Sequence, residues 1–313
     1  MTTVADGLYQ FGGSPVGTSL VSTKIFSTST KGRAWFVDTA YGGNGNGKSP
    51  KTAFSTMQNA FNHIASGDII YFVGKVTEQL VTPVEVFDVS VIGCGNRPRH
   101  ADSTPVSGNY AAATWAAPAS PVAAQALCRV LQQGWRFVNI LWAGSAGCAS
   151  LELVRNAASG DDERDASHTE VLSCRFAGVA STDSGIKFGS TSYTEIVNNV
   201  LIKDCEFQGC AHGINEHSAS LQFRMRVEDN RFQANTNHIV VGGYNAMIIR
   251  NIFGAFTTDS VKLTGGTGAN IVTMNYLSGT YSSVGGYTVA NANDEWAGNF
   301  NSLTGGITAA DPA

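Results

Sequence analysis

Four carboxylates have the residue types and the spacing that could support glycosidic-bond chemistry. Asp204 and Glu206 stand two residues apart, and Glu228 and Asp229 follow further along the chain. Cleavage of a glycosidic bond needs two carboxyl groups about 5 to 9.5 Å apart, one of which acts as the acid. On neighbouring strands these residues could form an acidic groove. The alternative, which we favour, is a solvated outer face of alternating strands.

Other candidate motifs lack the context that their chemistry requires. Residues 42–49 match the Gly-x-x-x-x-Gly-Lys-Ser phosphate loop, but Pro50 follows at once and the next helical pattern starts only at Ser55. The acidic run from Asp161 to Asp165 lacks the glycine and the final glutamate of a calcium loop. No cysteine and histidine spacing typical of zinc occurs. We therefore predict no catalytic residue, no metal site and no cofactor.

The elements that would position such side chains repeat along residues 137–277. Each copy consists of a small polar residue, any residue and a large apolar residue, and it closes a run typical of a strand. The copies start at Asn139, Cys174, Cys205, Asn230, Asn251 and Asn275. Their spacing settles at 21 to 25 residues, and a second short strand follows each copy after 9 to 12 residues.

This period, without a helical pattern inside it, indicates an all-β fold, a parallel β-helix whose coils bury their apolar faces by stacking. The six small residues are predicted to stack along one edge, about 4.8 Å apart per coil, with amides paired up the stack. Cys174 and Cys205 are predicted to be free thiols there. The alternative is a β-sandwich, whose strands should alternate without a fixed Asn-x-Phe phase.

Composition limits the function classes. The 313 residues are 43% hydrophobic and only 14% charged, with 35 glycines, which fits short strands and tight turns. The net charge of −4 and the absence of a long basic run argue against nucleic acid as a partner. No apolar run approaches about 18 residues and no signal peptide is evident, so no membrane segment is predicted.

The chain divides into three parts around one helix. An extended N-terminal arm occupies residues 1–32, the β-helix domain 33–304 and a C-terminal tail 305–313. The helix is predicted at about residues 55–66, with Ser55 as N-cap, and is expected to cap the first coil. Two excursions interrupt the period, at residues 93–125 and 155–168.

Three stretches carry a family resemblance. Residues 36–71, from Phe36-Val37-Asp38 through the Gly/Asn turn and the capping helix to Gly67-Asp68-Ile69-Ile70-Tyr71, resemble the opening of pectate-lyase-like right-handed parallel β-helix proteins, which are frequent in bacteriophage virions. Residues 91–99 and 296–300 resemble phage proteins encoded near capsid genes. The resemblance covers most of the chain from residue 33 onward. It implies a tailspike, a glycan-binding fibre or a capsid decoration protein.

The catalytic motifs of related enzymes are incomplete in this chain. Ala211-His212-Gly213 is similar to the Gly-His-Gly of polygalacturonases, but their Asn-Thr-Asp and Arg-Ile-Lys elements have no counterpart. The pectate-lyase pattern Arg-x-x-Pro-x-x-Arg is also missing. The sequence thus favours a protein that is not an enzyme.

We therefore predict a structural virion protein, a homotrimeric decoration protein on the outer capsid surface that binds the major capsid protein. The arm would supply the capsid anchors Leu8, Tyr9, Phe11 and Val16. The apolar residues in and beside the first excursion, Trp115, Val122 and Leu127, would form the subunit interface. The alternative is a tailspike or fibre that binds or cleaves host surface polysaccharide.

Overall fold

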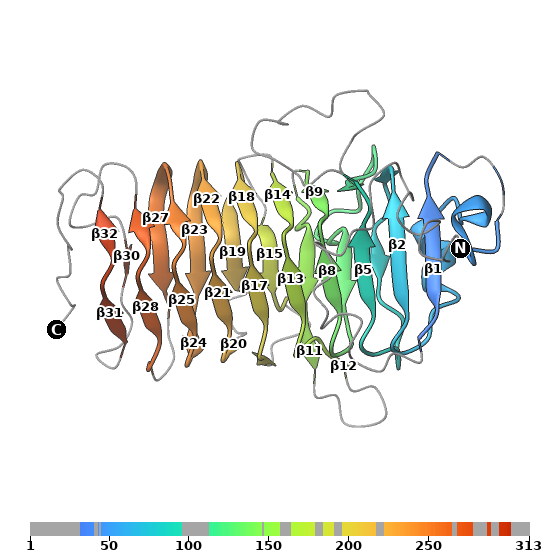
Figure 1. The fold of residues 1–313 in the computed structure, drawn as a ribbon. Helices are drawn as coiled ribbons and strands as arrows, with labels where there is room; N and C mark the ends of the chain where they lie inside the picture. The colour runs from blue at the N-terminus through green and yellow to red at the C-terminus, as the bar shows by residue number, and fades with distance from the viewer. Residues whose placement is uncertain are drawn as a thin grey trace, which may run out of the picture.

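The computed structural model describes residues 32–40, 43, 45–95, 113–145, 147–156, 164–178, 184–190, 196–216, 222–264, 268–277, 287–288 and 294–301. Over these residues the chain winds into an elongated parallel β-helix, in which each coil adds strands to three long parallel sheets (Figure 1). The predicted parallel β-helix is confirmed. The sandwich alternative is wrong, because the long sheets are parallel and a sandwich is antiparallel.

Sheet A has ten strands among the described residues. In spatial order they are β1 (Ala34–Asp38), β2 (Ile69–Val73), β5 (Ser90–Gly93), β8 (Arg136–Val138), β13 (Glu170–Leu172), β17 (Leu201–Lys203), β21 (Arg226–Glu228), β25 (Met247–Ile249), β28 (Ile271–Thr273) and β31 (Glu295–Ala297).

Sheet B follows sheet A in each coil, and from β8 onward the corner between them has two residues. Its described strands are β3 (Lys75–Val76), β6 (Thr114–Ala116), β9 (Leu141–Ala143), β14 (Arg175–Ala177), β18 (Glu206–Gln208), β22 (Arg231–Gln233), β26 (Ile252–Phe253), β29 (Tyr276–Leu277) and β32 (Phe300–Asn301).

Sheet C closes each coil. Its described strands are β4 (Leu80–Val81), β7 (Cys128–Val130), β10 (Leu151–Leu153), β15 (Ser184–Phe188), β19 (His212–Glu216), β23 (Asn235–Val241), β27 (Phe256–Leu263) and β30 (Tyr287–Thr288). Two smaller sheets hold β16 (Val197–Asn198), β20 (Gln222–Phe223) and β24 (Gly243–Tyr244), and the antiparallel pair β11 (Arg155–Asn156) and β12 (Arg164–Asp165).

Alternation along each short strand places one side chain inside the solenoid, where the coils stack it on its neighbours. In sheet A the inward row is fully buried and aliphatic or aromatic: Phe137, Val171, Ile202, Val227 and Ile248. In sheet B it is a column of rings, and Phe207 lies 4.7 Å from both Phe176 and Phe232. The second strands predicted after each repeat are confirmed as members of sheet C.

The corner between sheets A and B contains the predicted stack, with one correction. Cys205, Asn230, Asn251 and Asn275 occupy the same place in successive coils and are buried. The Asn230 Nδ2 donates to Asn251 Oδ1 at 3.0 Å, and the Asn251 Nδ2 donates to Asn275 Oδ1 at 3.1 Å. The amide ladder is therefore confirmed for the asparagine coils, and all six cysteines are free thiols.

Asn139 does not belong to this stack, so its prediction is wrong by one residue. The register pairs Leu141 with Arg175, which sets Ile140 beside Cys174 and leaves Asn139 at the preceding corner position. That position has positive φ in every described coil from Asn139 onward, 57° at Asn139, and asparagine tolerates it well. Its Nδ2 donates instead to Gly93 O at 2.8 Å.

The capping helix α3 runs over Met57–Phe61 and is shorter than predicted. Its N-cap is Thr56, whose hydroxyl accepts from the Asn59 N–H at 3.3 Å. The carboxylate of Glu78 takes up the Met57 and Gln58 N–H groups, so Ser55 is not needed as a cap. The helix lies at the β1 end of the solenoid (Figure 1), where its buried residues join the main core.

Two of the three predicted interface residues are part of this chain's own core. Trp115 and Leu127 are both fully buried. Trp115 lies in β6 and stacks on Trp142 with ring centroids 5.0 Å apart. The prediction is wrong for both, because one rung of the solenoid lies inside the range interpreted as an excursion. Only Val122, with 61% of its surface exposed, is accessible to a neighbour.

No helix within the described part of the chain has the length and apolar character needed to cross a membrane.

Candidate functional site

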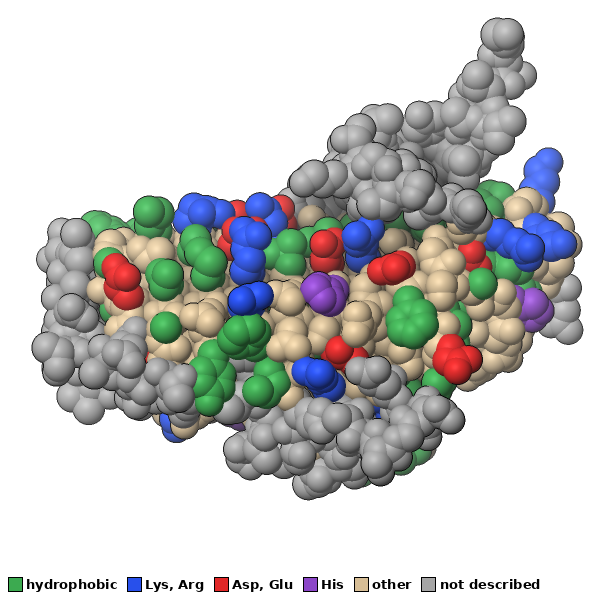
Figure 2. Space-filling view, turned by 90° about the horizontal axis from the view of Figure 1, so that it is seen from below, with side chains coloured by type: hydrophobic (Ala, Val, Ile, Leu, Met, Phe, Trp, Pro, Cys, Tyr) green, Lys and Arg blue, Asp and Glu red, His purple; other side chains and the backbone are tan. Residues whose placement is uncertain are grey.

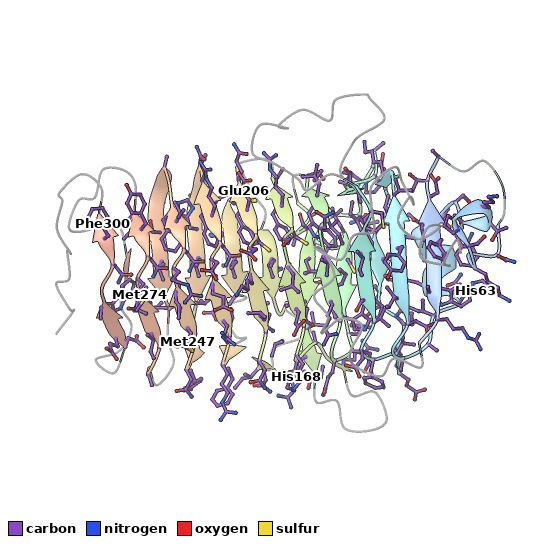
Figure 3. All side chains as sticks on the ribbon, in the orientation of Figure 1. His63, His168, Glu206, Met247, Met274 and Phe300 are labelled. Atoms are coloured by element: carbon purple, nitrogen blue, oxygen red, sulfur yellow. The ribbon has the colours of Figure 1, made fainter. Side chains whose placement is uncertain are left out.

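The predicted carboxylates do not share one groove. Asp204 is an exposed corner residue with φ of 53°, Glu206 points outward from β18 of sheet B, and Glu228 lies in β21 of sheet A. Because the corner separates the two sheets, Glu206 and Glu228 face different sides of the solenoid. Figure 3 labels Glu206 on the strands of sheet B.

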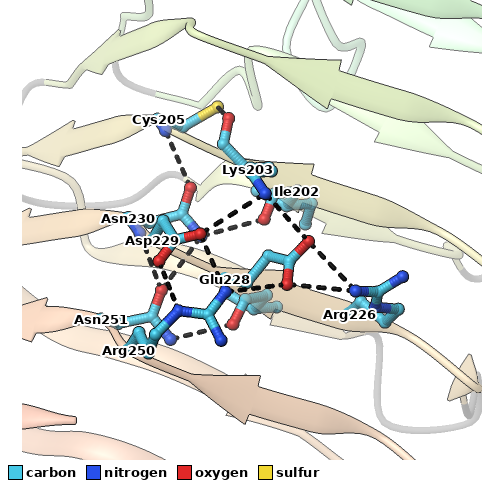
Figure 4. Close-up of polar contacts among 10 residues, drawn as sticks. Ile202, Lys203, Cys205, Arg226, Glu228, Asp229, Asn230, Arg250 and Asn251 are labelled. Carbon is cyan, nitrogen blue, oxygen red and sulfur yellow. Dashed lines mark hydrogen bonds and ion pairs between the residues drawn. The ribbon is translucent and has the colours of Figure 1, made fainter. Parts of the chain in front are cut away.

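Glu228 and Asp229 form ion pairs with a cluster of three basic side chains (Figure 4). Glu228 is nearly buried, and its carboxylate meets Arg226 at 3.1 Å, Arg250 at 3.2 Å and Lys203 at 3.5 Å. Asp229 accepts two hydrogen bonds from Arg250, at 2.8 and 2.9 Å. The hydrogen bond from Arg250 holds the pKa of Asp229 below its usual value. A carboxyl group kept ionised in this way is a poor general acid.

Glu206 has a different environment. In the register of sheet B it lies between Arg175 of the preceding coil and Arg231 of the following coil. Those guanidinium groups donate to glutamines instead, Arg175 to Gln208 at 2.6 Å and Arg231 to Gln233 at 3.1 Å. The Glu206 Oε1 is shielded from solvent and accepts no hydrogen bond within the described residues. Glu206 therefore has one carboxylate oxygen, Oε1, that could still accept a hydrogen bond.

A second polar constellation lies on sheet C. The register aligns Ser184, His212, Asn237 and Asp259 at one position of four successive coils. The His212 Nδ1 and the Asn237 Nδ2 are 3.2 Å apart. Because the amide nitrogen can only donate, His212 accepts at Nδ1 and carries its proton on Nε2. Burial and, secondarily, Lys262 lower the pKa of His212, which keeps the ring neutral near pH 7.

This row combines a hydroxyl, a neutral imidazole, an amide and a carboxylate, the kinds of groups that bind hydroxyl-rich ligands or transfer protons. In the sequence, His212 stands out only through its neighbours Ala211 and Gly213. Ser184 is 28 residues before it and Asn237 is 25 residues after it. These residues come together only through the register of successive coils. The intervening loops differ in length, so this register cannot be read from the sequence.

A different histidine, His238, is expected to make the free energy of unfolding depend on pH. It is fully buried between Phe232 and Phe253, and burial lowers its pKa from 6.5 to about 4. In the unfolded chain it binds a proton below pH 6.5, whereas the folded chain resists protonation until about pH 4. We expect the free energy of unfolding to fall by roughly 3 kcal/mol across this window.

The measurement is urea denaturation at pH 7 and at pH 4.5 for the wild type and for His238→Gln. The glutamine cannot titrate, so the variant should lose less stability than the wild type on acidification. Carboxylates that titrate near pH 4 affect both proteins alike and cancel in the comparison. An equal loss of stability in the two proteins would contradict this account.

The remaining predicted positions have simpler outcomes. The arm anchors Leu8, Tyr9, Phe11 and Val16 lie outside the described residues, as do Asp161 to Glu163 of the acidic run. In the loop that resembles a phosphate site, Gly47 donates to Thr52 O at 2.7 Å and Lys48 N donates to Asn46 Oδ1 at 3.1 Å. These N–H groups are used within the turn. The described residues contain no group of three potential metal ligands.

Comparison with known proteins identifies the fold and nothing finer. No family model matches the chain, and no curated protein matches it. Among solved structures, a pectin methylesterase from Aspergillus niger has a TM-score of 0.53 at 15% identity, with 88% of this chain and 87% of that one covered. A lacto-N-biosidase from Eubacterium ramulus has a TM-score of 0.50 at 8% identity, with coverage of 86% and 56%.

A phage protein, ORF18 of Geobacillus virus E2, is a more distant match, with a TM-score of 0.36 at 17% identity and coverage of 85% and 60%. Of the lacto-N-biosidase structure, this chain covers 56%, little more than half. Identities this low bear on the backbone alone. The chain has the parallel β-helix fold of these proteins, and its activity must be argued from its own residues.

Proposed function

We propose that this chain is a structural component of a bacteriophage particle, a homotrimeric β-helix decoration protein on the outer surface of the capsid. The observation that carries the proposal is the ion-pair cluster at Glu228 and Asp229. Two of the four carboxylates that could have acted on a glycan are neutralised by Lys203, Arg226 and Arg250. The solenoid then offers rigid lateral faces, which suit docking.

The surface supports the same proposal. Acidic and basic side chains are interspersed over the face shown in Figure 2, without a continuous stripe of one sign. Apolar side chains appear among them on the C-terminal half. Contiguous exposed apolar patches with a polar rim mark surfaces that contact other proteins.

The arm provides the test of the capsid role. Deletion of residues 1–32 should leave a folded trimer that no longer binds capsids, because the proposed anchors Leu8, Tyr9, Phe11 and Val16 are removed. Co-sedimentation with capsids that lack the protein measures binding, and circular dichroism measures folding. If the truncated protein still binds fully, the arm is not the anchor. If it unfolds or aggregates, the arm instead caps its own first coil.

A second candidate function is that of a tailspike or fibre that binds or cleaves host surface polysaccharide. The aligned row of Ser184, His212, Asn237 and Asp259 favours it, because these groups could contact sugar hydroxyls or transfer protons. The structural similarity to two carbohydrate-active enzymes is compatible with it but supports only the fold.

Incubation with host capsule or lipopolysaccharide distinguishes the two candidates. The decoration proposal expects no released oligosaccharide. Release would overturn that part of the proposal, and variants would then locate the site. Loss of activity in His212→Ala with activity kept in Glu206→Gln would place the chemistry on sheet C, and the reverse pattern would place it on sheet B.

A further inference from the structure

A loop near the N-terminal end of the solenoid presents apolar side chains to solvent. It covers residues 81–88, from the last residue of β4 towards β5. Val81, Val84 and Phe87 are 41%, 44% and 39% exposed. Large apolar side chains that are exposed together in one short loop indicate a contact with another molecule.

The two ends of the loop are fixed to the next coil. The Thr82 N–H donates to Arg129 O at 2.9 Å, and the Asp88 N–H donates to Gln133 O at 3.0 Å. Asp88 has φ of 57°, a conformation that a residue other than glycine keeps only where its surroundings hold it. The ends of the loop therefore do not depend on a partner for their conformation.

The middle of the loop is fixed through Val86. This side chain is partly buried against the main core, and Val86 O accepts a hydrogen bond from Trp135 Nε1 at 2.9 Å. The Phe87 N–H donates to Ser66 Oγ at 3.0 Å. Val84 and Phe87 are thus exposed on a backbone that is already ordered. Such a loop loses little conformational entropy when it binds.

The N-terminal arm joins the fold beside this loop. A Cβ on Gly32 would lie 1.8 Å from Gly67 O, so the two backbones are in contact and only glycine fits there. The Gly67 N–H donates in turn to Phe87 O at 2.9 Å. A partner that the arm binds is therefore brought to the end of the solenoid at which the loop is exposed.

Two exposed carboxylates belong to the same loop, those of Glu85 and Asp88. Within the described part of the chain neither of them forms an ion pair, either with the exposed Arg33 at the exit of the arm or with another cation. An apolar surface with a basic border would complement this loop.

We propose that the loop at residues 81–88 is a second docking point for the capsid protein, with Val84 and Phe87 seated in an apolar pocket that basic side chains border. The proposal rests on the capsid role proposed above. The arm and the loop act as two linked sites, so that binding of the arm presents the loop to the capsid at a high effective concentration. The loop alone binds too weakly to hold a particle, which is why deletion of the arm is expected to abolish binding.

Co-sedimentation of the full chain with capsids that lack the protein tests the loop. Val84→Lys and Phe87→Lys should each raise the dissociation constant about tenfold or more, because a charge replaces an apolar contact. Both side chains are exposed, so the fold, measured by circular dichroism, should be kept. Met274→Lys is the matched control. Met274 is 63% exposed, lies on the C-terminal third of the solenoid (Figure 3), and its variant should bind as the wild type does.

The outcomes separate the loop from the capsid role. Unchanged binding by both loop variants, with binding abolished by deletion of the arm, would overturn the loop proposal and leave the capsid role standing. Failure of the wild type to bind capsids would overturn both. Equal weakening by Met274→Lys would show a general effect of added charge, and it would also overturn the docking point.

The basic border of the pocket has a separate kinetic readout. Glu85→Gln should lower the association rate and flatten its dependence on salt, because a charge at the rim of an interface mainly steers the encounter. Equal salt dependence in the wild type and in this variant would overturn the basic border.

Photo-cross-linking identifies the occupant of the loop directly. Val84→Cys, labelled with a benzophenone maleimide, should form an adduct with the capsid protein when the complex is irradiated. All six native cysteines are buried, so the label enters at position 84. Met274→Cys, labelled in the same way, should form no such adduct. Adducts only within the chain, or only between copies of it, would assign the loop a different occupant and overturn the proposal.

Discussion

Replacing Asn251 by alanine is expected to lower the free energy of unfolding by about 4 kcal/mol. Asn251 is fully buried in the amide ladder. Its Oδ1 accepts from the Asn230 N–H and Nδ2, both at 3.0 Å, and its Nδ2 donates to Val227 O at 2.9 Å. Truncation leaves two donors and a carbonyl without these partners inside the solenoid. A buried polar group without a partner costs about 1 to 3 kcal/mol.

Urea denaturation at a fixed protein concentration measures the effect. Asn245→Gly is the control, because Asn245 is an exposed corner residue with φ of 57°, which glycine accepts. It should change stability by less than about 0.5 kcal/mol. Equal losses in the two variants would show that the ladder contributes no more than any corner asparagine.

Replacing Phe207 by alanine is expected to cost about 3 to 5 kcal/mol. The ring is fully buried and lies between Phe176 and Phe232, 4.7 Å from each and nearly parallel to both. The backbone spacing of the coils is fixed by sheet hydrogen bonds, so the cavity cannot close by collapse. Most of the lost contact energy therefore appears as lost stability.

Conservative leucine variants test whether the ring column acts as a unit. Phe207→Leu alone should cost about 1.5 kcal/mol or less. Combined with Phe232→Leu in the next coil, it should deviate from additivity by more than about 0.5 kcal/mol. Combined with Phe72→Leu in β2, several coils away, it should be additive, because each coil contacts only its neighbours. Additivity in both pairs would mean that the stacked rings contribute independently.

The period of small and large residues was enough to predict the solenoid. Asn230, Asn251 and Asn275 stand 21 and 24 residues apart, and each precedes an x-Phe or x-Leu pair, so their stacking follows from the repeat. The reason is that a coil cannot bury its apolar face alone, and a period therefore implies stacking. Where the spacing lengthens to 35 residues, between positions 139 and 174, the phase slipped by one residue and Ile140 was missed.

The sites could not be derived in the same way. Trp115 and Leu127 resembled an interface in the sequence because the loop before them hid a rung of the solenoid, and the structure buries both. The spacing in the sequence allows Glu206 and Glu228 to share one face, but the corner places them on different sheets. The row at His212 depends on the register between coils, and loop length sets that register. Local residue types determined the coil, whereas only the stacked structure decided which side chains from different coils meet.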